Sequence, residues 1–240
     1  MYILALDSTA VSASVALCDG DRLLGEITVS NGNTHSENLL PMVEELLLKF
    51  RLTPRDIDLF ACTAGPGSFT GIRIGVATIK GLAFAQSKPC IGVSTLHSLA
   101  YNLYGFGADS ADGVIVCPVM NARRSQVYNA LFRLCGGAPE RLTEDRAISI
   151  ADLEKELLQY SCPVYLCGDG YDITSRGFSA REIRETPERL RTQSGYSTAV
   201  AALRLYERGE SVTDRALVPV YLRPCQAERE RLEKENAKNI

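Results

Sequence analysis

The glycine-rich stretch Gly65–Gly75 restricts the fold of this chain more than any other feature. It follows an apolar run typical of a strand, Leu59–Thr63, and leads into a segment that predicts a helix from about Gly71 to Gln86. A glycine-rich turn between a strand and a helix directs backbone N–H groups and the positive helix end at one point. Such a turn suits either a bound anion or a close approach of another backbone. Its spacing matches neither the P-loop nor the dinucleotide-binding motif.

The helix after this turn is apolar or small around almost its whole circumference, so it must be covered on two sides. The sheet of its own domain covers one side. An earlier helix, ending near Phe50, begins at the capping-box pattern Thr34-x-x-Glu37 or at Asn38. We predict that the two helices dock a partner, although the rest of this chain could also cover both faces. The candidate interface residues are Leu39, Val43, Leu47, Ile72, Val76 and Ile79.

A strand that ends in a polar residue and then turns into a hairpin occurs twice, about 114 residues apart. The first strand is Tyr2–Leu6, followed by Asp7, and the second is Gly113–Met120, followed by Asn121. This repeat predicts two similar α/β units. We place the first domain at residues 1–110, and a smaller second domain with a charged tail at residues 111–240.

Composition and charge exclude several classes of protein. A net charge of −3 argues against broad nonspecific nucleic-acid binding. The chain has no apolar run near the about 18–20 residues of a membrane span, and its first residues do not form a signal peptide, so we expect a cytoplasmic protein. The eight cysteines lack a C-x-x-C pair, and His35 and His97 have no histidine partner at helical spacing. We therefore predict no metal site.

The duplicated strand, acidic turn and hairpin resemble the acetate kinase–heat-shock–actin superfamily. Its fold would be α/β, with duplicated actin-like, RNase H-like domains built from mixed sheets flanked by helices. Several stretches together resemble the TsaB (YeaZ) family more specifically. They are Leu4–Thr9, His35–Pro41, Gly65–Gly75, Ala122–Tyr128 and Pro219–Arg223.

This resemblance implies a non-catalytic scaffold or activating subunit in the formation of threonylcarbamoyladenosine next to the tRNA anticodon. The implied partners are a catalytic paralogue of TsaD type, with which the chain would form a heterodimer, and an ATPase of TsaE type. Contact with tRNA would be indirect, through the complex, and the chain would form a homodimer when the paralogue is absent. ATP would bind only in the assembled complex, if at all.

Two departures from catalytic relatives point the same way. The resemblance aligns Thr95 and Leu99 with the His-x-x-x-His metal ligands of the paralogue, and leucine cannot bind a metal. Asn121 stands where nucleotide-using members of the superfamily carry an aspartate, and an amide lacks the charge that Mg²⁺ prefers. We therefore expect no catalytic residue, metal or cofactor in this chain.

The alternative is a small-molecule kinase or ATPase that acts in a cleft between the two domains. Its support is a set of candidate phosphate-facing residues: Asp7, Gly65, Gly67 and Ser68. A metallopeptidase is a third possibility, but it has no paired metal ligands in the sequence.

Overall fold

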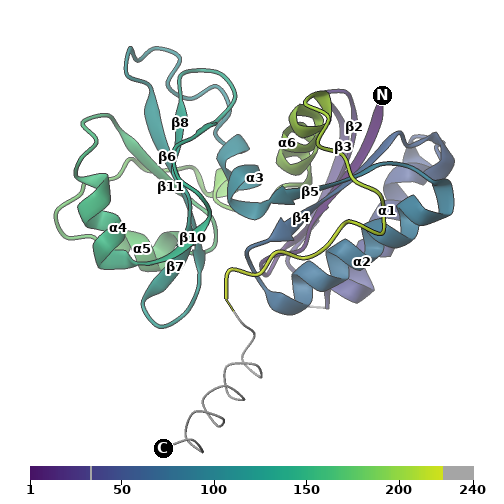
Figure 1. The fold of residues 1–240 in the computed structure, drawn as a ribbon, viewed down its shortest axis with the longest axis horizontal. Helices are drawn as coiled ribbons and strands as arrows, with labels where there is room; N and C mark the ends of the chain where they lie inside the picture. The colour runs from purple at the N-terminus through teal and green to yellow at the C-terminus, as the bar shows by residue number, and fades with distance from the viewer. Residues whose placement is uncertain (33, 224–240) are drawn as a thin grey trace, which may run out of the picture.

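The computed structural model describes residues 1–32 and 34–223, which form two lobes, each built on one sheet (Figure 1). In the first sheet the strand order is β3-β2-β1-β4-β5. Strands β1, β4 and β5 are parallel, whereas β2 and β3 form antiparallel hairpins with their neighbours. The strand bounds are β1 (Tyr2–Asp7), β2 (Ala13–Asp19), β3 (Arg22–Val29), β4 (Leu59–Gly65) and β5 (Cys90–Ser94).

Helices cover both faces of this first sheet. On one face, α1 (His35–Lys49) and α2 (Phe69–Gln86) pack on Leu4 and Leu6 of β1. On the other face, α6 (Gly195–Glu207) packs on Ile3 and its neighbours. Side chains alternate between the two faces of a strand, so a strand that is apolar at every position needs both layers. The short helix α3 (Thr95–Tyr101) lies next to α6.

The second lobe repeats this arrangement in a smaller form. Its sheet has the order β10-β7-β6-β8-β9, and β11 pairs with β6 in parallel. The order β10-β7-β6-β11 therefore matches β3-β2-β1-β4 of the first sheet. The elements are β6 (Val114–Asn121), β7 (Gln126–Asn129), β8 (Phe132–Leu134), β9 (Glu140–Arg141), β10 (Arg146–Ser149), β11 (Val164–Cys167), α4 (Ile150–Leu157) and α5 (Tyr171–Gly177), with short 3₁₀ helices at Pro54–Asp56 and Glu188–Leu190.

One predicted strand is divided into two. The sequence predicts a single strand over Gln126–Leu134, and both β7 and β8 keep the same register against β6. The ladder is interrupted opposite Pro118, which has no backbone N–H to donate. The side-chain amide of Asn129 instead donates to the carbonyl oxygens of Pro118, at 3.0 Å, and Ala130, at 3.1 Å.

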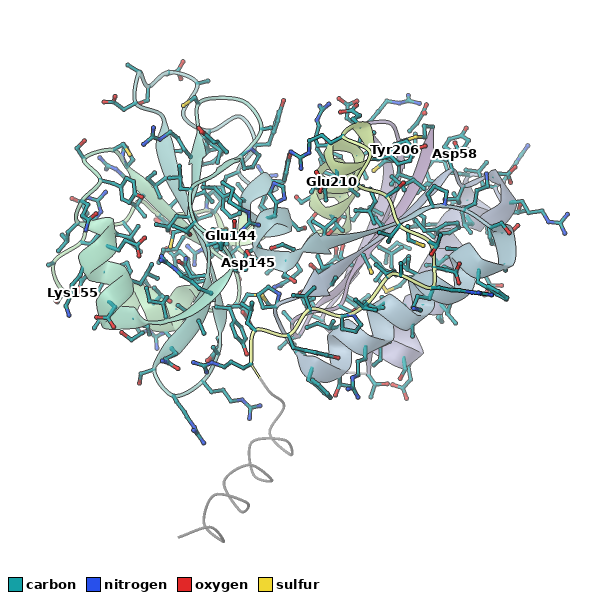
Figure 2. The ribbon with its side chains drawn as sticks, viewed as in Figure 1. Asp58, Glu144, Asp145, Lys155, Tyr206 and Glu210 are labelled. Carbon is teal, nitrogen blue, oxygen red and sulfur yellow. The ribbon has the colours of Figure 1, made fainter. Side chains whose placement is uncertain are left out.

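The two lobes meet through α3. Its residues Leu96 and Leu99, and Leu103 just after it, share one buried cluster with Val116 and Phe132 of the second sheet. A hydrogen bond also joins the lobes, because the Ser94 hydroxyl donates to Asp145 Oδ2 at 2.6 Å. Asp145 lies between the two lobes in Figure 2, where the Arg141 guanidinium also binds it at 2.6 Å.

The predicted α/β fold with duplicated, helix-flanked sheets is what the structure contains. The boundary between residues 1–110 and 111–240 stays a prediction, and α6, which lies beyond it, packs on the first sheet. The charged tail predicted at the end of the second domain, from Ala227 to Ile240, lies outside the described residues. Within the described part of the chain, no helix combines the length and apolar character needed to cross a membrane.

The prediction of the interface residues was wrong. All six are buried, with exposed fractions between 0 and 5%. The reason is that the most apolar side of each helix faces its own sheet, where these side chains form the first core cluster with Leu4, Leu6 and Phe60. The six residues that are core residues of this chain, and not interface residues, are Leu39, Val43, Leu47, Ile72, Val76 and Ile79.

Two substitutions on α2 distinguish its buried side from its exposed side. Ile79 is fully buried, so Ile79→Ala should lower the free energy of unfolding by about 2–5 kcal/mol. Phe84 is 66% exposed, so Phe84→Ala should change it by less than about 1 kcal/mol. Urea denaturation of the two variants and the parent chain measures both values. Equal losses would contradict this assignment of the faces of α2.

Candidate functional site

A cavity of about 680 Å³ lies between the lobes. The first lobe contributes the loop after β1 and the loop from β4 to α2, and the second contributes the end of β6 and the loop after β11. Residues 219–223 pass along its mouth, and their path between the lobes is visible in Figure 1. Its lining includes Gly67, Ser68, Asn121, Arg123, Asp169, Tyr221 and Arg223.

Glycines at the end of β4 and in the first turn of α2 permit close backbone packing. Gly65 has φ +128°, and a Cβ there would lie 2.2 Å from the carbonyl oxygen of Val220. At Gly71 a Cβ would lie 1.9 Å from the carbonyl oxygen of Ser8. Of the two roles that suit such a turn, the structure therefore shows the close approach of other backbone segments.

Only two of the four candidate phosphate-facing residues reach the cavity. Gly67 and Ser68 line it, and Ser68 caps α2 by accepting the Gly71 N–H at 3.3 Å. Gly65 lies under the Val220 carbonyl, and Asp7 is 0% exposed. The prediction that Gly65 and Asp7 face a phosphate was therefore wrong, because later backbone and side chains cover them.

The Asp7 carboxyl is sealed inside the first lobe. Its Oδ1 accepts hydrogen bonds from the Thr9 N–H at 2.8 Å and the Thr9 hydroxyl at 2.7 Å. Its Oδ2 has no hydrogen-bond partner among residues 1–32 and 34–223. Burial raises the pKa of Asp7 to about 6, although the two Thr9 hydrogen bonds act in the opposite direction. The carboxyl thus serves as a local cap of the turn after β1.

The residues of the cavity do not fit the Mg²⁺–nucleotide site that actin-like folds imply. Asn121 uses its side-chain oxygen to accept the Arg123 N–H at 2.8 Å. Asp169 accepts the Asn121 N–H at 3.2 Å and is the one carboxylate on the part of the wall that the structure describes. Hard cations prefer several oxygen ligands with negative charge, and the buried Asp7 cannot supply a second one. We derive no catalytic step from this cavity.

The two positions that the resemblance aligns with the metal ligands of the catalytic paralogue are also inaccessible to a metal ion. Thr95 and Leu99 are buried, and Leu99 belongs to the cluster between the lobes. His97 stacks on Phe132 with ring centroids 5.4 Å apart and an interplanar angle of 4°. Burial, with smaller contributions from Arg141 and Arg208, lowers the pKa of His97 to about 4. A neutral histidine in this setting packs the interface between the lobes.

Residues 213–223, which we call the C-terminal strap, connect the two lobes across the cavity mouth. Val220 N–H donates to the Ala64 carbonyl at 2.7 Å, and the Tyr221 hydroxyl accepts from Arg73 Nε at 2.9 Å. On the second lobe, Arg223 donates to the Ala122 carbonyl at 3.1 Å. It also donates to the Gln126 side chain.

The strap residues were absent from the predicted site. The sequence carries a signal for them, the Pro219–Arg223 motif, but a motif alone does not say which strand ends it will join.

The outward sides of α1 and α2 present a different apolar surface from the one predicted. Leu40 is 54% exposed, Leu48 is 75% exposed and Phe84 is 66% exposed. Ala77 and Ala85 are exposed beside Phe84 on α2. We call this surface, consisting of Leu40, Leu48, Ala77, Phe84 and Ala85, the outer helix face.

The buried Asp7 carboxyl makes stability depend on pH. Its pKa is raised on folding, from 3.8 to about 6, so its contribution is full below 3.8 and is lost as the pH rises through 6. This difference corresponds to about 3 kcal/mol. Relative to the parent chain, Asp7→Asn should therefore gain up to about 3 kcal/mol in free energy of unfolding between pH 4 and pH 8.

Urea denaturation at the two pH values measures this gain. Asp112→Asn, at an exposed residue, is the matched control and should show no such dependence on pH. A parallel shift in both variants would mean that Asp7 is not the titrating group.

Comparison with known proteins assigns the family. A family model described as TsaD, tRNA N6-adenosine threonylcarbamoyltransferase, matches residues 23–224. The tRNA threonylcarbamoyladenosine biosynthesis protein TsaB of Bacillus subtilis is 31% identical over 229 residues, which is 95% of this chain and 96% of that protein. TsaB of Escherichia coli is 36% identical over 134 residues, 55% of each chain.

Solved structures give the same assignment. YeaZ from Pseudomonas aeruginosa superposes with a TM-score of 0.74 at 27% identity, covering 92% of this chain and 99% of that one. A glucomannokinase from Arthrobacter, at 12% identity and a TM-score of 0.50, covers 86% of this chain and 99% of its own and shares the fold alone. The similarity across nearly the whole length, on a pair of actin-like lobes, shows that this chain belongs to the TsaB (YeaZ) family.

Proposed function

We propose that this chain is an accessory subunit, without a catalytic site of its own, in the biosynthesis of threonylcarbamoyladenosine in tRNA. Its relatives carry that biosynthetic role in their names. The observation that carries the non-catalytic assignment is the state of Asp7, which is 0% exposed and separated from the cavity between the lobes. A carboxylate that reaches neither substrate nor metal cannot assist transfer of a group.

The outer helix face is the proposed docking surface for a catalytic partner of TsaD type. It places Leu40 and Leu48 on α1 and Phe84 on α2 on the side that faces away from the sheet. Exposed apolar side chains gathered on neighbouring helices mark interaction sites in soluble proteins. The small residues Ala77 and Ala85 allow a partner helix to approach closely.

The family match of residues 23–224 to a TsaD model supports the choice of partner. Two subunits with the same fold can pair equivalent helices across a pseudo-twofold axis. For the same reason we propose that the chain pairs with itself when the paralogue is absent. An ATPase of TsaE type and the tRNA then join through the assembled complex.

The alternative, a kinase or ATPase acting in the cavity, is disfavoured by three features. The carbonyl of Val220 covers Gly65, Asn121 stands where the superfamily resemblance implies an aspartate, and Asp7 is buried. Phosphoryl transfer requires backbone and carboxylate groups that reach the phosphate or its metal ion, and these three positions do not supply them.

Titration calorimetry on the isolated chain tests this assignment. We expect no heat of binding when Mg·ATP is added at micromolar concentrations, because the loop and carboxyl that would hold the phosphates are covered. Binding in the micromolar range, followed by release of phosphate, would support the enzyme instead.

Charged substitutions on the outer helix face test the docking surface. Leu48→Glu and Phe84→Glu should each weaken binding of a TsaD-type subunit at least tenfold, since an unpaired charge is costly in an apolar interface. The matched control is Leu158→Glu, at a 50% exposed leucine in the second lobe, which should bind normally. Titration calorimetry measures the affinities.

A tRNA modification assay with and without each variant connects docking to function. Product formation should fall with the affinity for the partner and should recover at high subunit concentration. Unchanged binding by both glutamate variants would eliminate this surface, and full modification without any form of the chain would eliminate the proposed function.

A further inference from the structure

The C-terminal strap belongs to the same layer of the first lobe as α1 and α2. Leu217 of the strap is 3% exposed and lies in the core cluster that also contains Leu46 of α1 and Ile79 of α2. Figure 1 shows the strap running alongside α2. All three elements cover one face of the first sheet, so their outward sides face the same side of the lobe.

One stripe of α2 joins the strap to the outer helix face. The stripe consists of Arg73, Ala77, Lys80 and Phe84, at spacings of four, three and four residues. Residues three and four apart lie on the same side of a helix. Ala77 and Phe84 belong to the outer helix face. The other two bind the strap, which therefore borders this face along α2.

Hydrogen bonds from α2 hold the strap in this position. The Lys80 ammonium donates to the carbonyl oxygens of Arg215, at 3.2 Å, and Leu217, at 2.8 Å. Further along the strap, Arg73 Nε donates to the Tyr221 hydroxyl at 2.9 Å. Because the strap is already ordered, a partner that covered it would lose little conformational entropy.

The strap exposes apolar side chains on its outward side. Val218 is 58% exposed directly after the buried Leu217, so the two side chains point in opposite directions. Val220 is 48% exposed and Tyr221 is 40% exposed. Single exposed apolar side chains are common, but these border the exposed Phe84 stripe of α2. Together they enlarge one apolar surface of the kind that marks interaction sites.

Tyr221 also belongs to an ordered cluster with an arginine. Its ring centroid lies 4.9 Å from that of Phe69, and the Arg73 guanidinium lies 3.9 Å from the Phe69 centroid. Within residues 1–32 and 34–223, Arg73 forms no ion pair. A guanidinium that is held in place without a carboxylate can bind one on a partner. Tyrosine and arginine are also enriched among the residues that contribute most to binding at interfaces.

The outer helix face alone is small for a stable complex. It has five side chains, two of them alanine. A specific interface takes about 20–30 residues from each partner. A partner that docks on α1 and α2 must therefore also cover neighbouring elements, and the strap is the neighbour that borders the exposed stripe of α2.

We propose that the strap is the third element of the docking surface. The TsaD-type subunit would cover Val218 and Tyr221 together with the outer helix face, and it would present a carboxylate to Arg73. This inference rests on the docking proposed above. Because Arg223 binds the strap to the Ala122 carbonyl of the second lobe, the partner would contact an element that both lobes hold.

Titration calorimetry of the full chain with a TsaD-type subunit tests the strap. Val218→Glu should weaken binding at least tenfold, since it places an unpaired charge in an apolar contact. Arg73→Ala should weaken it about tenfold through the loss of a hydrogen-bonded ion pair. The matched controls are Leu158→Glu and Arg176→Ala, at exposed residues of the second lobe, which should bind like the parent chain.

Amide hydrogen exchange separates contact with the partner from the position of the strap. The Val220 N–H donates to the Ala64 carbonyl at 2.7 Å, so its exchange rate reports whether the strap is in place. In the isolated chain, Val218→Glu should leave this rate unchanged. Faster exchange in that variant would contradict the proposal, because the Val218 side chain would then hold the strap instead of contacting the partner.

Phe84→Glu distinguishes failure of this proposal from failure of the proposed docking. If Phe84→Glu weakens binding but Val218→Glu or Arg73→Ala does not, the strap is not part of the interface, and docking on the two helices stands. If none of the three variants changes the affinity, the proposed docking surface fails as well.

Discussion

The two-sided burial of the central strands is the constraint on which the rest of this structure depends. Ile3, Leu4 and Leu6 of β1 are all fully buried, and they point to opposite faces of the first sheet. A strand of this kind requires a helix layer on each side. Here α1 and α2 provide one layer, and α6 provides the other from the far end of the chain. After α6 the chain continues into the C-terminal strap, which lies across the mouth of the cavity between the lobes.

Close packing also fills the space around the turn between β4 and α2. Gly65 at the end of β4 and Gly71 in the first turn of α2 let the carbonyl oxygens of Val220 and Ser8 lie against the backbone. The covered Asp7 then caps its own turn. The docking surface that we propose, the outer helix face, lies outside this cleft.

Much of the fold follows from local patterns. The continuous apolar run Tyr2–Leu6 predicts β1 within one residue at each end, and the hairpin expected after it is formed by β2 and β3, because burial and turn chemistry act over short distances. The faces of α2 could not be predicted in this way. With apolar residues all round, its periodicity does not say which side meets the sheet, and only the packed position of Ile79 decides it. The short β10 and α5 lack strong patterns and were not predicted.

The site was less accessible from the sequence than the fold. Gly67 and Ser68 reach the cavity, whereas Asp7 and Gly65 do not; Gly65, for example, is covered by Val220, which lies 155 residues further along the chain. Contacts at such separation leave no local pattern. The hydrogen bond from the Tyr196 N–H to Glu26 Oε1 is another such contact, since the two residues are far apart in the sequence.

The late position of α6 has a consequence for synthesis of the protein. When the ribosome has made the first five strands, one face of their sheet, including Ile3, Ala5 and Ile91, still lacks the helix that covers it. About 100 more residues must be synthesised before α6 can cover this apolar surface. During that interval the exposed apolar surface is of the kind that chaperones bind.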